Sequence, residues 1–146
     1  MAETVHASCV LVGNRAVLIR GPAGAGKSSL ALSLLDAAGT RIPFARLVAD
    51  DRVQLAAVHG RLLASVPAAI AGLLEVHGLG IRRVPHEPEA VVGLIVDLAA
   101  HDADRLPVAG ALATTILGVG LPRLPVAADA DPLPIVIASL STAAGG

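Results

Sequence analysis

Aromatic residues are almost absent from this sequence, and their scarcity excludes one class of function. Trp and Tyr do not occur, and Phe44 is the one aromatic residue among 146. Proteins that bind single-stranded nucleic acid stack successive bases on aromatic rings, and this chain has no such platform. The net charge of -1 also excludes a broadly basic surface for a polyanion. We therefore expect no nucleic-acid partner.

Cysteine and long apolar runs are equally scarce. Cys9 is the single cysteine, which excludes an internal disulfide and a cysteine-based zinc cluster. It lies within an apolar run, as is typical of a small buried side chain. No apolar run reaches the roughly 18–20 residues that span a bilayer, and residues 1–6 lack the basic and apolar regions of a signal peptide. We expect a cytoplasmic protein with no membrane contact.

One segment matches the phosphate-binding P-loop pattern G-x-x-x-x-G-K-[ST] in full. Glycines let successive N–H groups point inward at phosphate oxygens, and a following helix directs its positive dipole end at the same anion. An apolar strand precedes the segment and a helical pattern follows it, so a chance glycine-rich turn is the weaker interpretation. We predict that it binds ATP with Mg²⁺. The nucleotide-binding residues are Gly21, Pro22, Ala23, Gly24, Ala25, Gly26, Lys27 and Ser28.

The order of apolar runs predicts the fold class. The apolar content of 54% excludes general disorder, and 146 residues suit one domain, residues 1–146. With few helices expected, the order predicts an α/β fold, a single P-loop kinase-like domain with a mixed, strand-rich sheet. We expect strands at 8–12, 16–20, 45–49, 54–58, 61–65, 91–98, 113–117 and 124–127, a glycine-interrupted segment at 73–84, helices at 27–38 and 135–144, and a loop at 122–134.

Carboxylates follow two of the predicted strands. Asp50 and Asp51 close the strand at 45–49, where a P-loop sheet commonly presents a second carboxylate. Neighbouring side chains on a strand point to opposite faces, so a clean end would aim one Asp at the phosphates and a turn would bring in both. The alternative is a pair that only starts a turn. Asp97, at the end of 91–96, is the weaker candidate.

Two further residues have two interpretations each. His6 precedes the first predicted strand and, taken alone, is an ordinary surface histidine. Glu75 interrupts an apolar segment next to Gly78 and Gly80. It is either a solvent-facing strand residue or a metal ligand in a loop shaped by the glycines.

Taken together, these segments resemble the catalytic domain of HPr kinase/phosphorylase. The matching pieces are His6, the P-loop, LVADDRV at 47–53 and LEVHGLGI at 74–81, in the family's order and with similar gaps. LGV at 117–119, followed by Leu-Pro, is a weaker match. The P-loop is generic, whereas the other two long motifs are specific to the family. The resemblance spans roughly residues 5–126.

The resemblance implies a Mg-ATP-dependent serine protein kinase. Its protein substrate would be HPr, the phosphocarrier of the sugar phosphotransferase system, and it would reverse the reaction by phosphorolysis. The family implies a homo-oligomer, typically a hexamer. Lys27 would hold the transferring phosphate, while Ser28 and Glu75 would coordinate Mg²⁺. His6 would help to arrange the site, and the pair Asp50 and Asp51 would supply the proton acceptor, with Asp51 slightly favoured.

Three departures from the family pattern leave other functions open. We expect a short form without the family's N-terminal domain, His77 stands where an arginine is usual, and residues 127–132 contain no arginine. These losses favour a regulatory ATP-binding module of the same family with little transferase activity. A small-molecule kinase or NTPase of another P-loop family is the third interpretation. The nearby residues able to replace the missing charge, if their side chains turn inward, are Arg82, Arg83 and Arg123.

Overall fold

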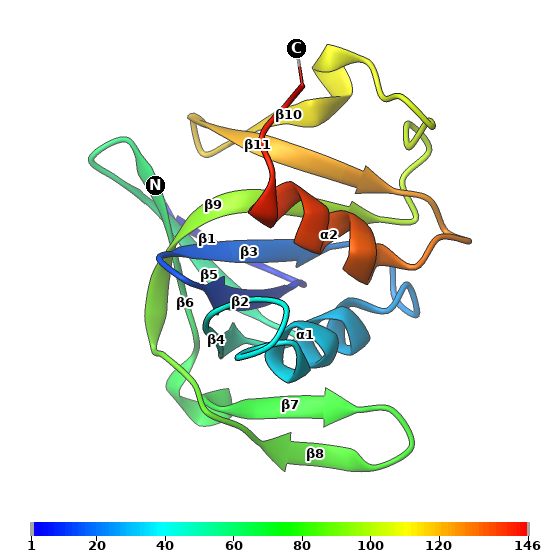
Figure 1. The fold of residues 1–146 in the computed structure, drawn as a ribbon. Helices are drawn as coiled ribbons and strands as arrows, with labels where there is room; N and C mark the ends of the chain where they lie inside the picture. Colours follow the sequence, from blue (N-terminus) through cyan, green and yellow to red (C-terminus); the bar gives the residue numbers. More distant parts are fainter. Residues whose placement is uncertain (1, 146) are drawn as a thin grey trace.

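In a computed structural model, residues 2–145 are described and form eleven strands and two α-helices (Figure 1). Two short 3-10 turns lie at Ala68–Ile70 and Ala109–Leu112. Among these residues, neither helix combines the length and the apolar character that crossing a membrane requires. The elements are β1 (Ala2–Val5), β2 (Ser8–Val12), β3 (Arg15–Arg20), α1 (Lys27–Asp36), β4 (Ala45–Ala49), β5 (Val53–Val58), β6 (Arg61–Ser65), β7 (Leu73–Val76), β8 (Gly80–Arg83), β9 (Glu89–Leu98), β10 (Ala113–Ile116), β11 (Val119–Val126) and α2 (Pro132–Ser141).

The long strand β9 makes the main sheet mixed. Its first residues pair antiparallel with β6, whereas its later residues pair parallel with β3 on one side and β11 on the other. The whole sheet runs β1-β5-β6-β9-β3-β2-β4, with β10 and β11 branching from β9, and β7 and β8 form a separate hairpin. The prediction of a mixed, strand-rich sheet with few helices is therefore confirmed.

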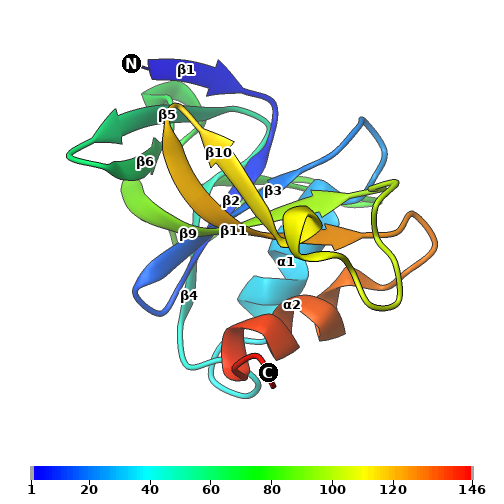
Figure 2. The ribbon, with the colours of Figure 1, turned by 90° about the horizontal axis from the view of Figure 1, so that it is seen from above.

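Both α-helices cover the same face of the sheet, and the strand residues divide between two cores accordingly. Val17 and Ile19 of β3 pack with Leu30 and Leu34 of α1, while Leu18 belongs to the core on the opposite face. Figure 2 shows α1 and α2 on one side of β3 and β9, with β5, β6 and β10 on the other. Cys9 is buried in the second core, as predicted, and burial raises the pKa of its thiol to about 12.

The strand directions gather five chain segments at one edge of the sheet. β3, β9 and β11 are parallel, so residues 21–26, 99–101 and 127–131 leave the sheet on the same side. β2 is antiparallel to β3 and β4 is antiparallel to β2, so the end of β4 and the start of β2 also lie there. Ligands of open α/β sheets bind outside the carboxyl ends of the strands. The candidate site is therefore expected at this edge.

The N-terminal strand β1 was not predicted, and His6 consequently lies in the turn between β1 and β2 rather than before the first strand. β1 pairs with β5 at the border of the sheet, and its residues are mostly exposed. An exposed edge strand needs no apolar alternation, so its sequence gives no strand signal.

The predicted loop at 122–134 is correct only for residues 127–131, which connect β11 to α2. β11 continues through Pro122 and Pro125 to Val126, and α2 begins at Pro132, three residues before the predicted start. Pro125 pairs with Asp97 of β9 beyond the end of β10, so its nitrogen faces no neighbouring strand. Pro132 occupies the first helical turn, where a missing N–H costs nothing, and Asp131 accepts the Leu133 N–H at 3.1 Å.

Candidate functional site

The P-loop, residues 21–28, joins β3 to α1 in a conformation that depends on glycine. Gly26 precedes the helix with a φ of 98°, a left-handed value that other residues rarely adopt. At Gly21, an added Cβ would lie 3.1 Å from the Cβ of Leu98. Among the described residues no side chain caps α1 at its N-terminus. The N–H groups and the positive dipole end of the helix are therefore available to an anion.

A cavity of about 530 Å³ opens in front of this helix end. We call it the phosphate cavity. Three segments of the sheet edge line it, namely the P-loop, the end of β4 and the start of β2, and the β7–β8 hairpin is the fourth. The cavity therefore brings together most of the predicted site residues. The predicted residues that line it are His6, Ala23, Gly24, Gly26, Lys27, Ser28, Asp51 and Glu75, and the additional ones are Ser8, Ser29 and His77. The predicted residues outside its lining are Gly21, Pro22, Ala25 and Asp50.

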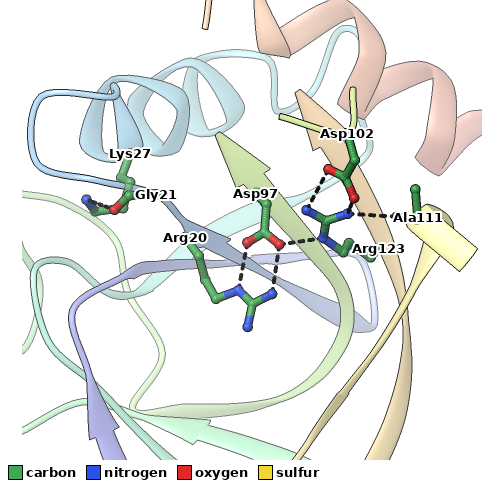
Figure 3. A network of polar contacts seen from close by, with 7 residues as sticks. All are labelled: Arg20, Gly21, Lys27, Asp97, Asp102, Ala111 and Arg123. Atoms are coloured by element: carbon green, nitrogen blue, oxygen red, sulfur yellow. Dashed lines mark hydrogen bonds and ion pairs between the residues drawn. The ribbon is translucent and has the colours of Figure 1, made fainter. Parts of the chain in front are cut away.

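The side chain of Lys27 lies against its own loop. Its Nζ donates a hydrogen bond to the carbonyl oxygen of Gly21 at 2.7 Å (Figure 3). It donates another to the carbonyl oxygen of Pro22 at 3.2 Å. An ammonium group has three donors and is strongly attracted to anionic oxygens. Lys27 also lines the phosphate cavity, so its charge is held at the place where the loop would bind phosphate.

Asp50 is buried behind the phosphate cavity and links three chain segments. Its Oδ1 accepts hydrogen bonds from the hydroxyls of Ser8 and Ser28, both at 2.7 Å. Its Oδ2 accepts the backbone N–H of Glu75 at 3.1 Å. The carboxylate thus fixes the P-loop serine relative to β2 and β7. Ser8 was missed because a lone serine at the start of an apolar strand carries no signal of its own.

Asp51, in contrast, is exposed and faces the phosphate cavity. Its φ of 72° turns the chain at the end of β4, so the two adjacent carboxylates do not follow strand alternation. Its Oδ1 lies 2.7 Å from Nε2 of His6, and the two side chains are 65% and 61% exposed. The exposed carboxylate is therefore positioned by a histidine yet remains open to a second molecule.

The donor set at the cavity suits Mg²⁺. Ser28 and Glu75 offer a hydroxyl and a carboxylate on facing segments, and Asp50 orients the Ser28 hydroxyl. Within residues 2–145, no three His, Cys, Asp or Glu side chains converge to hold a metal by themselves. Mg²⁺ prefers oxygen ligands, and in phosphate-transfer sites one or two protein ligands are completed by water and substrate phosphates. The residues present fit such an ion.

Positive charge is sparse at the phosphate cavity. Its lining, in the part of the chain that the structure describes, includes His77 but no arginine. Arg82 and Arg83 lie exposed on β8, and Arg123 is bound by two carboxylates. The three arginines considered as replacements for the missing charge therefore do not line this cavity.

Asp97 is the centre of an ion-pair network beside the P-loop (Figure 3). Arg20 donates from Nε and Nη2 to the two oxygens of Asp97, both at 2.7 Å. Arg123 donates from Nε to the same carboxylate and from Nη1 to Asp102 at 2.7 Å and the Ala111 carbonyl at 2.9 Å. The network fastens β3, β9 and β11 at the edge where the P-loop begins. It directs the Asp97 carboxylate at Arg20 and Arg123, and Asp97 does not line the phosphate cavity.

We predict that Asp97→Asn lowers stability at neutral pH and weakens its dependence on acid. Burial raises the pKa of Asp97, but hydrogen bonds and charge from Arg20 and Arg123 outweigh burial, and the net pKa is lowered. The unfolded carboxyl has a pKa of about 3.9, so the stabilisation is present above that pH and is lost as pH falls through the folded value. Removing the charge takes the carboxylate partner from Arg20 and leaves Arg123 with Asp102 alone, at a cost of roughly 1–3 kcal/mol.

Thermal unfolding between pH 7 and pH 2 measures both effects. For a domain of this size we expect the Tm at pH 7 to fall by about 3–10 °C. Asp104→Asn, which neutralises an exposed carboxylate in the adjacent loop, is the matched control and should leave the Tm unchanged. An Asp97→Asn protein with the parent's Tm and acid transition would contradict the role given to the network.

The comparisons with known proteins agree on one family. The model of the HPr Serine kinase C-terminal domain matches residues 1–136. An HPr kinase/phosphorylase of Clostridium tetani is 42% identical over 81 residues, which is 56% of this chain and 25% of that protein. One of Xylella fastidiosa is 39% identical over 84 residues, 57% of this chain and 25% of that protein. These matches span about a quarter of the curated relatives' length.

The structural comparison covers nearly the entire chain. The solved structure of the Hpr(Ser) kinase/phosphatase from Coxiella burnetii superposes with a TM-score of 0.74 at 28% sequence identity. The match covers 94% of this chain and 93% of that one, so the strand-rich sheet and its two helices are shared. The chain therefore belongs to the HPr serine kinase C-terminal domain family.

Proposed function

We propose that this chain is a Mg-ATP-dependent serine protein kinase acting on an HPr-like phosphocarrier, with residues 1–146 as one catalytic domain. The observation that carries the proposal is the shared cavity: the P-loop lysine and the exposed carboxylate of Asp51 line the same space at the start of α1. Phosphoryl transfer to a protein hydroxyl requires a group that binds the donor's phosphates and, next to it, a group that accepts the hydroxyl proton. Family membership supports the choice of substrate.

In the forward reaction, each group that lines the phosphate cavity would have a separate role. The phosphates of ATP would bind the N–H groups of the P-loop and the ammonium of Lys27, which would exchange its carbonyl partners for phosphate oxygens. Mg²⁺, held by Ser28 and Glu75, would neutralise charge on the phosphate oxygens. The serine oxygen of the partner attacks the γ-phosphorus, the bond to the leaving oxygen of ADP breaks, and Asp51 takes the serine proton. His6 holds that carboxylate in place.

Phosphorolysis would run through the same groups in reverse. An oxygen of inorganic phosphate attacks the phosphorus of phosphoserine, the seryl oxygen leaves, and Asp51 returns its proton to that oxygen. The inorganic phosphate becomes pyrophosphate, whose charge the P-loop and Lys27 would bind. Both directions thus use one proton carrier and one anion cradle.

Transfer to a phosphocarrier tests the proposal directly. The chain is incubated with ATP, Mg²⁺ and an HPr-like phosphocarrier, and the intact mass of the carrier is measured. We expect one added phosphoryl group, absent when the carrier's acceptor serine is replaced by alanine. Calorimetric binding of ATP with no phosphoryl group on the carrier would reject the kinase.

A regulatory ATP-binding module is the second candidate function, and one observation favours it. Among the described residues that line the phosphate cavity, His77 stands where the family pattern usually has an arginine. Arg123 forms ion pairs with Asp97 and Asp102 instead of lining the cavity. Arginines directed at transferring phosphate contribute about 10³–10⁵ in rate in comparable enzymes. A chain without them would bind ATP yet transfer phosphate slowly, so we expect weak kinase activity and weaker phosphorolysis.

His77→Arg should raise the rate of phosphoryl transfer by at least about tenfold, a fraction of the 10³–10⁵ that a well-placed arginine provides. His77 lines the phosphate cavity from the β7–β8 hairpin, so the new guanidinium can reach the transferring group. Initial rates at saturating ATP measure the change. His59→Arg makes the same substitution at an exposed position in the turn between β5 and β6, outside the lining of the phosphate cavity, and should leave the rate near that of the parent. Equal rates for His77→Arg and the parent would contradict this role.

We propose that the chain also self-associates, as a hexamer by resemblance to the family. Large apolar side chains remain exposed, among them Leu79, Ile81, Leu106 and Val108, each at 62% or more. Exposed apolar surface of this kind commonly marks an interface. Light scattering across the micromolar range should report a mass several times that of one chain. A monomer mass throughout that range would reject the proposal.

A further inference from the structure

Ser8 is a buried serine that the proposed reaction does not use. It begins β2, lines the phosphate cavity and is 1% exposed. Its hydroxyl donates to Oδ1 of Asp50, the same oxygen that accepts the hydroxyl of Ser28, and both distances are 2.7 Å. The other residues of β2 are apolar, and burying a hydroxyl costs free energy unless it is hydrogen-bonded. The serine at this position is therefore tied to its contact with Asp50.

We propose that Ser8 is a positioning residue for the metal site, because it holds Asp50 where the Ser28 hydroxyl presents its lone pairs to Mg²⁺. This inference rests on the proposed function, since it concerns the metal of the same reaction. A serine hydroxyl has one proton and two lone pairs. Ser28 donates its proton to Asp50, so both lone pairs of its oxygen stay free for a cation. If the carboxylate moved away, the proton would be free to turn into the cavity and oppose the cation.

The hydrogen bonds that hold the Asp50 carboxylate come from three different parts of the fold. Glu75 donates its backbone N–H to Oδ2 at 3.1 Å from β7, which belongs to the separate β7–β8 hairpin. Ser28 donates from the P-loop and is itself the group to be positioned. Ser8 donates from β2, which pairs with β3 on one side and with β4 on the other. The Ser8 hydroxyl is therefore the contact that ties the carboxylate to the middle of the main sheet.

The register of β2 places this hydroxyl between the P-loop and the carboxylate. Ser8 pairs with Ile19 of β3, the strand that leads into the P-loop. The next residue of β2, Cys9, pairs with Ala49, which directly precedes Asp50. β2 thus lies between the two strand ends from which the metal site is built. Both hydroxyl contacts to Asp50 have the length of charge-assisted hydrogen bonds, which are about twice as strong as neutral ones.

Calorimetry with ATP, in the presence of Mg²⁺ and with EDTA in its place, tests this role on the full chain. The ratio of the two dissociation constants is the gain in affinity that the metal provides. Ser8→Thr and Ser8→Val add nearly the same volume to the buried position, but only threonine keeps the hydroxyl. Ser8→Thr should keep the gain of the parent, whereas Ser8→Val should lower it by about three- to tenfold, the loss of one hydrogen bond. Ser8→Ala, which adds no volume, should lower the gain as Ser8→Val does.

The rate of phosphoryl transfer at different Mg²⁺ concentrations provides a second measurement. Ser8→Val should raise the Mg²⁺ concentration for the half-maximal rate by about three- to tenfold and leave the rate at saturating Mg²⁺ within about twofold of the parent. Its affinity for ATP in EDTA should also stay within about twofold of the parent. Thr115→Val removes a hydroxyl from an exposed position on β10, outside the lining of the phosphate cavity, and should change none of these values.

The outcomes separate the role of Ser8 from the proposed function. A wild-type chain whose ATP affinity does not depend on Mg²⁺ would reject the proposed metal site and the role of Ser8 together. A wild-type gain that Ser8→Val and Ser8→Ala both retain would overturn the role of Ser8 alone. So would an equal loss in Ser8→Thr and Ser8→Val with the parent's gain in Ser8→Ala, because packing would then be the cause.

Discussion

Lys27→Ala is expected to abolish measurable phosphoryl transfer and to weaken ATP binding by roughly 10–100-fold. The ammonium group is the only charged donor in the P-loop sequence, and it lines the cavity at the N-terminal end of α1, where the phosphates would bind. Charged hydrogen bonds are worth about 1.5–3 kcal/mol, which corresponds to that loss of affinity. Removing a donor that stabilises the transition state costs a further factor of about 10²–10³ in rate.

The fold should survive this substitution. Within residues 2–145, Lys27 bonds only to the carbonyl oxygens of Gly21 and Pro22, which lie in a loop at the surface, so its loss leaves no buried polar group without a partner. Calorimetry with ATP, transfer assays and thermal unfolding measure the three consequences. Arg61→Ala removes one positive charge from an exposed position on β6 and serves as the matched control. A Lys27→Ala chain with the parent's ATP affinity and turnover would refute the P-loop assignment.

The sequence also permits a chemical version of this experiment. Lys27 is the single lysine of the chain, so an amine-reactive reagent modifies Lys27 and the N-terminal amine alone. We expect ATP with Mg²⁺ to protect Lys27 from modification while the N-terminal amine continues to react. Peptide mass analysis after labelling distinguishes the two positions.

Features that depend on neighbouring residues were predictable from the sequence. The P-loop, its preceding strand and the following helix are consecutive, so the spacing of glycines, lysine and serine contains the whole pattern. The Asp50 and Asp51 pair follows a buried strand directly, and its position at the sheet edge follows from that strand's end. The mixed sheet was predictable for the same reason, because few helical segments separate the strands.

Features that depend on distant residues were not predictable. Ser8 bonds to Asp50 across 42 positions of sequence, and Arg20 bonds to Asp97 across 77. Neither partner has a local pattern that indicates the other. The prolines of β11 suggested a loop because proline interrupts most strands, yet Pro125 lies beyond the end of β10, where no hydrogen bond is required.

The two adjacent carboxylates show how the structure divides roles that the sequence left open. Asp50 is saturated by three hydrogen bonds and lies outside the lining of the phosphate cavity. Asp51 has one partner, His6, and faces the cavity. A proton acceptor must reach the hydroxyl of the incoming protein, which favours Asp51 for that role. Asp50 would instead orient Ser28.

Asp51→Asn is therefore expected to lower the rate of transfer by about 10²–10⁴, the usual contribution of a general base, with little change in ATP affinity. The amide keeps the shape of the side chain but does not accept the serine proton. Because Asp51 is exposed, thermal stability should be that of the parent. Asp50→Asn should behave differently: it disturbs a buried group that accepts two hydroxyls and a backbone N–H, so it should lower the Tm.

Turnover at saturating ATP, ATP affinity and Tm, measured for both variants, separate the base from the positioning residue. Because Asp50 orients Ser28, Asp50→Asn should also weaken Mg²⁺-dependent nucleotide binding. His6→Gln, which can still hydrogen-bond to Asp51, should lose less activity than His6→Ala, because the carboxylate stays in position. An Asp51→Asn chain that transfers phosphate at the parent's rate would exclude Asp51 as the base. If Asp50→Asn then lost turnover without losing stability or nucleotide affinity, the proton acceptor would be the buried carboxylate.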